Sequence, residues 1–130
     1  MKIYYREKSG GIEILRCFGI ESRVEIPGMI DDKLVISAAP YAFSSHMDEK
    51  EELKNASLWE VSEGLGFGRE EHVLAGNDVE EIVFPYTLKE IGRYIFYGCG
   101  NLKKLEFSDS LMQIGCGAFT GCHALEKLTV

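Results

Sequence analysis

The sequence predicts a solenoid of stacked coils with parallel β-strands, because one phrase occurs twice at a fixed interval. "IGRYIFYGC", from Ile91 to Cys99, returns as "IGCGAFTGC", from Ile114 to Cys122, and five of the nine letters are identical in register. The two copies are 23 residues apart (114 − 91). A fixed period of this length is typical of repeat proteins, in which a unit can bury its apolar face only against its neighbours.

Extending the phrase in both directions gives two regular coils, residues 79–101 and 102–124, and the start of a further coil, residues 125–130. Apolar residues keep the same columns in each unit, while the residues between them vary. The columns are Val79/Leu102/Leu125, Ile82/Leu105/Leu128, Phe84/Phe107/Val130, Leu88/Leu111, Ile91/Ile114, Phe96/Phe119 and Cys99/Cys122. We therefore expect one shared core. It should contain Ile82, Leu105, Leu128, Phe84, Phe107, Phe96 and Phe119.

Each unit opens with a run that alternates polar and apolar residues, namely "EEIVF", "KKLEF" and "EKLTV". This period of two is typical of half-buried strands. We expect parallel strands near residues 80–84, 103–107 and 126–130. The positions that alternate with the core columns should face outward and form a candidate binding face. They are Glu81, Val83, Lys104, Glu106, Lys127 and Thr129. An ordinary solvated face, with opposite charges paired across the coils, is an equally good interpretation.

The second half of each unit predicts a tight bend followed by a short helical turn. Gly92 and Gly115 stand at the expected bends, and Gly98 and Gly121 at the expected ends of the turns, where positive φ favours glycine. The cysteine after each turn is expected to be a small apolar core residue. Adjacent coils would point these thiols in the same direction, so we expect no disulfide between them.

A less regular first coil occupies residues 24–46, where Ile26-Pro27 corresponds to Phe84-Pro85 and "YAF" to "YIF". Before it, residues 1–23 contain two extended runs around "KSGG", which predicts an N-terminal β-hairpin cap over the open end of the coil. Residues 47–78 interrupt the repeat and are either a degenerate coil or an insert. We favour an insert, in which a short helix begins at Asp48 and an exposed loop covers residues 63–72.

The repeated phrase resembles that of the BspA-type bacterial leucine-rich repeat family, whose units have 23 residues and centre on a phrase such as "SIGDYAFYGC". The resemblance covers residues 79–130 strongly and residues 24–46 moderately. It implies that the 130 residues form a single right-handed leucine-rich repeat solenoid used for binding other proteins and surfaces. Many members of the family are secreted or lie on the cell surface, whereas this chain carries no export signal.

Composition excludes several classes of function. The net charge of −7 argues against nucleic acid as a partner, since such proteins need a concentrated basic surface. No apolar run approaches the roughly 18 residues of a membrane helix, so we expect no membrane partner. Without an export signal or paired cysteine motifs, the four cysteines predict reduced thiols and a cytoplasmic protein.

Residues suited to catalysis are sparse in the sequence. His46, His72 and His123 lie far apart, and no pattern of metal ligands or phosphate-binding glycines occurs. We predict no catalytic residue, no metal and no cofactor. The main hypothesis is a non-catalytic module that binds a protein or peptide on its sheet face. The alternative is an N-terminal accessory or regulatory domain of a larger protein, and an enzyme is the third choice.

The last six residues, "LEKLTV", predict a strand with an unpaired edge and a partly covered apolar end. Exposed edges and open apolar ends favour association with another chain. Either the native protein continues, or a weak homodimer forms through this end. Both alternatives remain open from the sequence.

Overall fold

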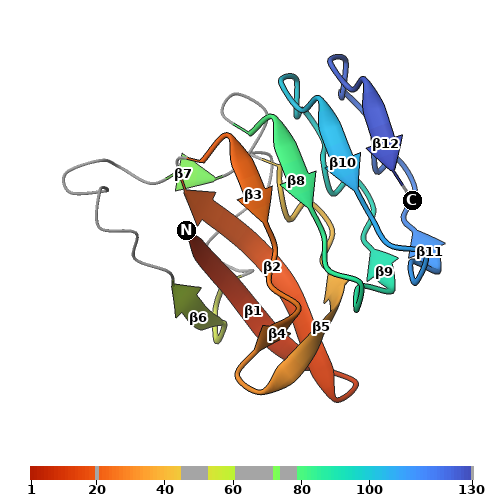
Figure 1. Cartoon of the computed structure of the whole chain (residues 1–130). Helices are drawn as coiled ribbons and strands as arrows, with labels where there is room; N and C mark the ends of the chain where they lie inside the picture. The colour runs from red at the N-terminus through yellow and green to blue at the C-terminus, as the bar shows by residue number, and fades with distance from the viewer. Residues whose placement is uncertain (20, 45–52, 61–71, 74–78, 130) are drawn as a thin grey trace.

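The computed structural model describes residues 1–19, 21–44, 53–60, 72–73 and 79–129, and these residues form strands and loops. The strands are β1 (Lys2–Lys8), β2 (Gly11–Gly19), β3 (Arg23–Glu25), β4 (Met29–Ile30), β5 (Lys33–Ala38), β6 (Ser57–Glu60), β7 (His72–Val73), β8 (Glu81–Val83), β9 (Glu90–Ile91), β10 (Lys104–Glu106), β11 (Gln113–Ile114) and β12 (Lys127–Thr129). They belong to two sheets that enclose the core between them (Figure 1).

The first sheet consists of the strands that open each coil, β3, β8, β10 and β12, side by side in chain order (Figure 1). All neighbours are parallel. Val24, Ile82, Leu105 and Leu128 lie opposite one another in register. The 23-residue alignment therefore predicted both the direction and the register of these strands correctly.

The second sheet joins the coils to the N-terminal hairpin. Strands β5, β9 and β11 are parallel, one from each coil. Strands β1 and β2 form the predicted antiparallel hairpin, and β2 pairs in parallel with β5. The hairpin thereby lies over the first coil, and its residues Ile12 and Ile14 are fully buried in the core.

The first coil lies directly against the second, because β3 pairs with β8. The described parts of the interruption lie elsewhere: β6 pairs with β1, and β7 pairs with β2. These strands therefore widen the hairpin. The expected helix at Asp48 and the expected loop at residues 63–72 fall almost entirely outside the described residues. His46 also lies outside the described residues.

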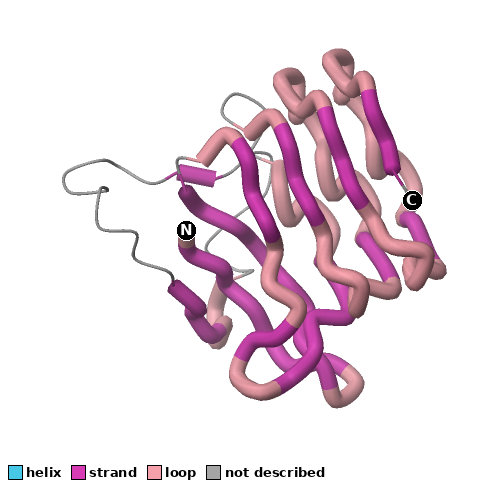
Figure 2. The backbone as a smooth tube through the Cα atoms, viewed as in Figure 1, coloured by secondary structure: helices cyan, strands magenta, loops and turns pink. Residues whose placement is uncertain are grey.

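The expected short helical turns are wrong: the described residues contain no helix, and the segments after Gly92 and Gly115 are successive turns (Figure 2). A helix needs each N–H to donate within its own segment. Here alternate N–H groups donate to the next coil, as from Tyr94 to Cys116 O at 3.1 Å and from Phe96 to Ala118 O at 3.2 Å. The predicted positive φ is present at Gly98 (79°) and Gly121 (84°).

Glycine is required at the expected bends for a different reason from the one predicted. A Cβ on Gly92 would lie 2.3 Å from the backbone nitrogen of Pro40, and one on Gly115 would lie 2.2 Å from that of Arg93. Each of these atoms belongs to the preceding coil. Glycine is therefore required at this column for close approach of two coils.

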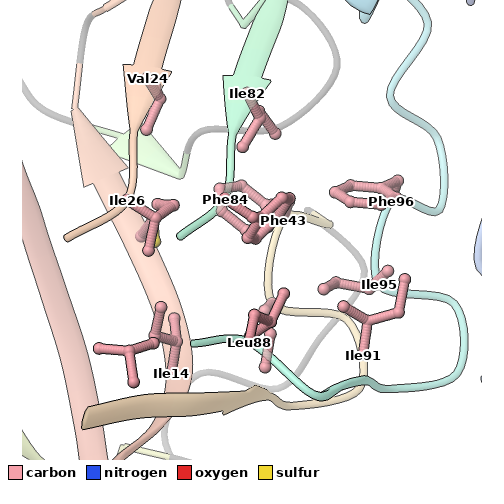
Figure 3. Packing of buried hydrophobic residues seen from close by; sticks show 14 of the residues in the cluster. Ile14, Val24, Ile26, Phe43, Ile82, Phe84, Leu88, Ile91, Ile95 and Phe96 are labelled. Carbon is pink, nitrogen blue, oxygen red and sulfur yellow. The ribbon is translucent and has the colours of Figure 1, made fainter. Parts of the chain in front are cut away.

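The core lies between the two sheets, with aromatic rings at its centre (Figure 3). Phe96 is fully buried, with its ring centroid 5.8 Å from that of Phe43 and 5.9 Å from that of Phe119. Five of the seven predicted core residues are buried: Ile82, Leu105, Phe84, Phe107 and Phe96. Phe119 is only partly buried, and Leu128 is wrong, since 46% of it is exposed. Both belong to the last coils, where one side has no described neighbour.

Candidate protein-interaction face

The six residues predicted to face outward lie together on the first sheet. Strand β8 contributes Glu81 and Val83, and β10 places Lys104 and Glu106 directly opposite them. Strand β12 adds Lys127 and Thr129 in the same register. These six residues are half-buried or exposed, while Ile82 and Leu105, between the residues of the first two pairs, are buried. We call this surface the sheet face.

Strand β3 extends the sheet face by two residues that the sequence analysis did not select. Arg23 lies opposite Glu81, and Glu25 lies opposite Val83. The signal was available, because the match between Val24 and Ile82 already places the residues on either side of Val24 on the outward face. The first coil was less regular, and only its apolar columns were used.

On the half of the sheet face formed by β3 and β8, Arg23 is paired with two carboxylates of the same half. The Arg23 guanidinium lies 2.6 Å from a carboxylate oxygen of Glu81 and 2.7 Å from one of Glu25. Hydrogen bonds to Glu25 and then to Glu81 raise the pKa of Arg23 above its ordinary value. This half fits the interpretation of a solvated face with opposite charges paired across the coils.

The half on β10 and β12 has a different charge arrangement. Lys104 lies directly opposite Lys127 in the parallel register, and both are exposed. Among the described residues neither ammonium forms an ion pair, whereas the adjacent Lys103 lies 3.4 Å from Glu80. Two like charges side by side are unfavourable for the sheet itself. This half therefore presents two cations that form no ion pair with the described residues, although Lys104 also lies opposite Glu81 of β8.

Comparison with known proteins agrees with this arrangement of coils. The family described as the BspA type leucine-rich repeat region (6 copies) matches residues 70–130. Residues 70–130 are thus similar to BspA-type leucine-rich repeats. No curated protein matches the chain.

The BspA-type repeats also have solved structural relatives. The crystal structure of a leucine-rich cell surface protein from Faecalibacterium prausnitzii A2-165 aligns with 95% of this chain at 19% identity and a TM-score of 0.63. The crystal structure of a leucine-rich repeat protein from T. pallidum aligns with 98% of this chain and 78% of its own at 16% identity and a TM-score of 0.44. The first likeness shows a shared leucine-rich repeat fold. This chain spans 28% of the length of that first protein.

The cysteine column of the BspA-type repeats is tied to the core. The Cys99 thiol lies 3.1 Å from the carbonyl oxygen of Phe43, and the Cys122 thiol 3.5 Å from that of Phe96, one coil further on. Desolvation raises the pKa of Cys99 to about 12 and that of Cys122 to about 11. Thiols held protonated in this way are poor nucleophiles. All four cysteines are free, as predicted, and Cys116 is the exposed one.

A second polar cluster ties the hairpin to the coils. Glu13 is 3% exposed, and its carboxylate accepts hydrogen bonds from Arg6 at 2.7 Å, Lys8 at 3.1 Å and Ser37 at 3.2 Å. Lys8 also lies 2.9 Å from Glu90 of the second coil. Its partners Glu90 and then Glu13 raise the pKa of Lys8, and the hydrogen bond from Lys8 lowers the pKa of Glu90. This cluster joins three parts of the chain and has the character of a structural network.

The described residues hold little that suits chemistry. Within this described part, no group of three or more His, Cys, Asp or Glu side chains comes close enough to hold a metal ion. Nor does any helix there have the length and apolarity to cross a membrane. A hollow of about 360 Å³ opens beside the hairpin turn, lined among others by Lys8, Lys89 and Glu90, without histidine or cysteine.

Proposed function

We propose that the protein is a non-catalytic interaction module whose sheet face binds a protein or peptide partner. The observation that carries the proposal is the adjacent pair Lys104 and Lys127, which has no ion pair among the described residues. On the same sheet Arg23 is neutralised by Glu81 and Glu25. Stability alone favours the second arrangement. The two lysines without ion pairs support a role in contacting an acidic group of a partner.

Mixed charge on the rest of the sheet face favours a protein over a polyanion. Glu106 and Glu25 occupy the row next to the lysines, alongside Val83 and Thr129. A polyanion would meet repulsion from these carboxylates. A folded partner or a peptide can place a carboxylate on the lysines and a neutral or basic group beside them.

The test is partner capture followed by charge reversal. Proteins retained by the immobilised chain from an extract of its source cells are identified, and the affinity of the purified partner is measured by calorimetry. Lys104→Glu/Lys127→Glu should weaken the complex by at least about tenfold, since like charges then face the acidic group. The matched control is Lys54→Glu/Arg93→Glu, which gives the same net charge on exposed positions outside the sheet face.

Two results decide this test. A loss confined to the Lys104/Lys127 variant supports the sheet face as the binding site. Equal affinity of the two double variants would show that the partner binds elsewhere.

An accessory domain within a larger polypeptide is the second candidate. It is favoured by the alignment with the leucine-rich cell surface protein, of whose length this chain spans 28%. In that case the sheet face would bind either another part of the same longer chain or a partner of that longer chain. Mass spectrometry of the protein from its source cells measures the native mass, and 14.6 kDa would contradict this candidate.

Weak self-association is proposed through the end of the coil stack. Ile114 and Leu128 are 51% and 46% exposed there, and β12 has a free edge within the described part of the sheet. Pairing of this edge with a second copy would cover the apolar end. Sedimentation over a concentration series should show a dimer that Ile114→Glu/Leu128→Glu removes. A single-species monomer at all concentrations would contradict it.

A further inference from the structure

The hollow of about 360 Å³ lies on the outward face of the second sheet. Lys104 and Lys127 belong to the other sheet. The hairpin turn at Lys8 and Ser9 forms one wall, and Met112 and Gln113 of the third coil form another. Ile36, Lys89 and Glu90 lie between them. We call this hollow the hairpin groove.

A bulge in β5 gives the groove its apolar floor. The pairing of β2 with β5 skips Ile36, since Ile12 pairs with Val35 and the next residue, Glu13, pairs with Ser37. The extra residue in such a bulge is unpaired, and the ladder is locally disrupted around it. Ile36 lies against Gly11 of the hairpin, where an added Cβ would come within 2.7 Å of it. Ile36 is thereby fixed on the outward face.

From Ile36 an apolar stripe runs in both directions along this face. In one direction, backbone hydrogen bonds place Ile36, Lys89 and Met112 in a row across three coils. Met112 is 78% exposed, and methionine adapts its shape to apolar ligands. In the other direction, Leu34 is the next outward residue of β5 and pairs with Met29 of β4. These two are 45% and 54% exposed. The stripe spans about 15–20 Å, a length that five or six extended residues cover.

The charges around the groove leave one cation available. Lys8 is held by Glu13 and Glu90 at 3.1 Å and 2.9 Å, and Glu90 also accepts a hydrogen bond from Ser37 at 3.1 Å. Lys89 lies in the middle of the apolar row and forms no ion pair with the described residues. The groove therefore offers a positive charge flanked by exposed apolar side chains.

We propose that the hairpin groove binds an extended peptide segment in which an acidic residue is flanked by apolar side chains. The carboxylate pairs with Lys89, and the apolar side chains cover Ile36 and Met112. Leu34 and Met29 continue the contact along the stripe. A single small acid would satisfy Lys89 but leave the stripe exposed, so the length of the stripe favours a peptide. The site is separate from the sheet face and does not depend on the function proposed for it.

The test uses an array of synthetic twelve-residue peptides, in which acidic and apolar residues are varied independently. Binders are measured in solution by fluorescence polarisation against the full chain. Peptides with an acidic residue between apolar residues should bind, and matched peptides with lysine or serine at the acidic position should bind at least about tenfold more weakly. Lys89→Glu and Met112→Ser should each weaken binding of the acidic, apolar peptides by about the same factor.

Matched controls separate the two faces. Lys104→Glu/Lys127→Glu lies on the other sheet and should leave peptide binding unchanged. Lys89 and Met112 are exposed, so we expect their variants to fold as the wild type does. Unchanged thermal unfolding of the variants verifies this. The proposal is overturned if no acidic, apolar peptide binds, or if Lys89→Glu and Met112→Ser bind these peptides as the wild type does. It is also overturned if only the Lys104/Lys127 variant loses binding, which would place the peptides on the sheet face.

Discussion

The two ends of the coil stack carry the same kinds of residue in the same columns but bury them very differently. In one column Ala38 and Ile91 are 1% and 3% exposed, whereas Ile114 is 51% exposed. In another, Leu105 is 1% exposed and Leu128 46% exposed. The first coil is covered by the hairpin, and the last coil has no described neighbour on its outer side. A column therefore fixes the direction in which a side chain points, while a neighbouring coil decides whether it is buried.

This difference between the ends has an energetic meaning. Burial of apolar area stabilises the chain in proportion to the area removed from water. The same substitution should thus cost more at the covered end and in the middle of the stack than at the open end. The predictions below test this comparison, starting with the largest expected effect.

Phe96→Ala should destabilise the fold far more than Phe119→Ala, although both residues occupy one column. Phe96 is fully buried among Phe43, Phe84 and Phe119, so its removal should lower the free energy of unfolding by about 3–5 kcal/mol. Phe119 is only partly buried and should cost less than half as much. Urea denaturation followed by circular dichroism measures both. Equal losses would contradict the difference between the ends.

Gly92→Ala should be the next largest loss, about 1–3 kcal/mol, because its Cβ would overlap the backbone of Pro40 at 2.3 Å. Gly115→Ala meets Arg93 just as closely, at 2.2 Å. The last coil can move outward, so we expect a smaller loss there.

Gly100→Ala is the control for both glycine variants, since an added Cβ there has no neighbour within 4 Å. It should change stability by no more than about 0.5 kcal/mol. Thermal unfolding measures all three. A loss at Gly115 as large as that at Gly92 would mean that the last coil is held as rigidly as the second.

Thiol reactivity should follow the same gradient along the stack. Cys17 and Cys99 are buried, whereas Cys116 is exposed at the open end. With an aromatic disulfide reagent, Cys99 should react at least about tenfold more slowly than Cys116, because burial both shields it and raises its pKa. After unfolding without reductant the chain should show 4 free thiols, and 2 would reveal a disulfide.

The smallest expected effect is the pH dependence of the pair Lys8 and Glu90, which ties the hairpin to the second coil. The lowered pKa of Glu90 gives a contribution that is present above about pH 4.5 and lost as the pH falls through its folded value. The raised pKa of Lys8 gives one that is present below about pH 10.5 and lost above its folded value. Both groups are largely solvated, so the pair should contribute less than about 1 kcal/mol at neutral pH.

Urea titrations of the wild type and of Glu90→Gln at neutral pH and near pH 3 measure this contribution. The difference in stability between the two proteins should shrink as the pH falls. A difference that is the same at both values would show that the carboxylate charge does not matter. Glu126→Gln, at an exposed position of the last coil, is the matched control.

The repeat made much of the fold predictable. The columns that hold Ile82 and Leu105 predicted the parallel strands and their register, because stacked coils must repeat their apolar positions. The hairpin followed from the two extended runs around "KSGG". Helical turns were predicted wrongly, since the sequence between Gly92 and Cys99 shows apolar spacing but not the partners of its N–H groups. Those partners belong to the next coil.

Buried polar residues were the least predictable part. Glu13 stands at an outward position of its strand, and its burial comes from Arg6, Lys8 and Ser37 of other strands. Arg16 is fully buried, and its guanidinium donates to the carbonyl oxygens of Tyr41 and Ser44. Neither contact follows from spacing in the sequence. On the sheet face, the six outward residues were placed correctly, but the unequal pairing of their charges needed the neighbouring strand β3.

The successive turns of the coils, such as residues 93–98, lie along one edge of the stack, which we call the turn edge. Hydrogen bonds along this edge all run in the same direction. Along this edge each coil donates to the following one, as from Tyr41 to Arg93 O and from Tyr94 to Cys116 O. At the last coil the equivalent donors are the N–H groups of Gly117, Phe119 and Gly121, which make no hydrogen bond among the described residues. Any segment that extends the stack must therefore present carbonyl groups here. Two copies related by a two-fold axis could pair their β12 edges, but their turn edges would oppose donor to donor. Such a dimer should accordingly stay weak, and a coil in the same orientation is the geometrically matched neighbour.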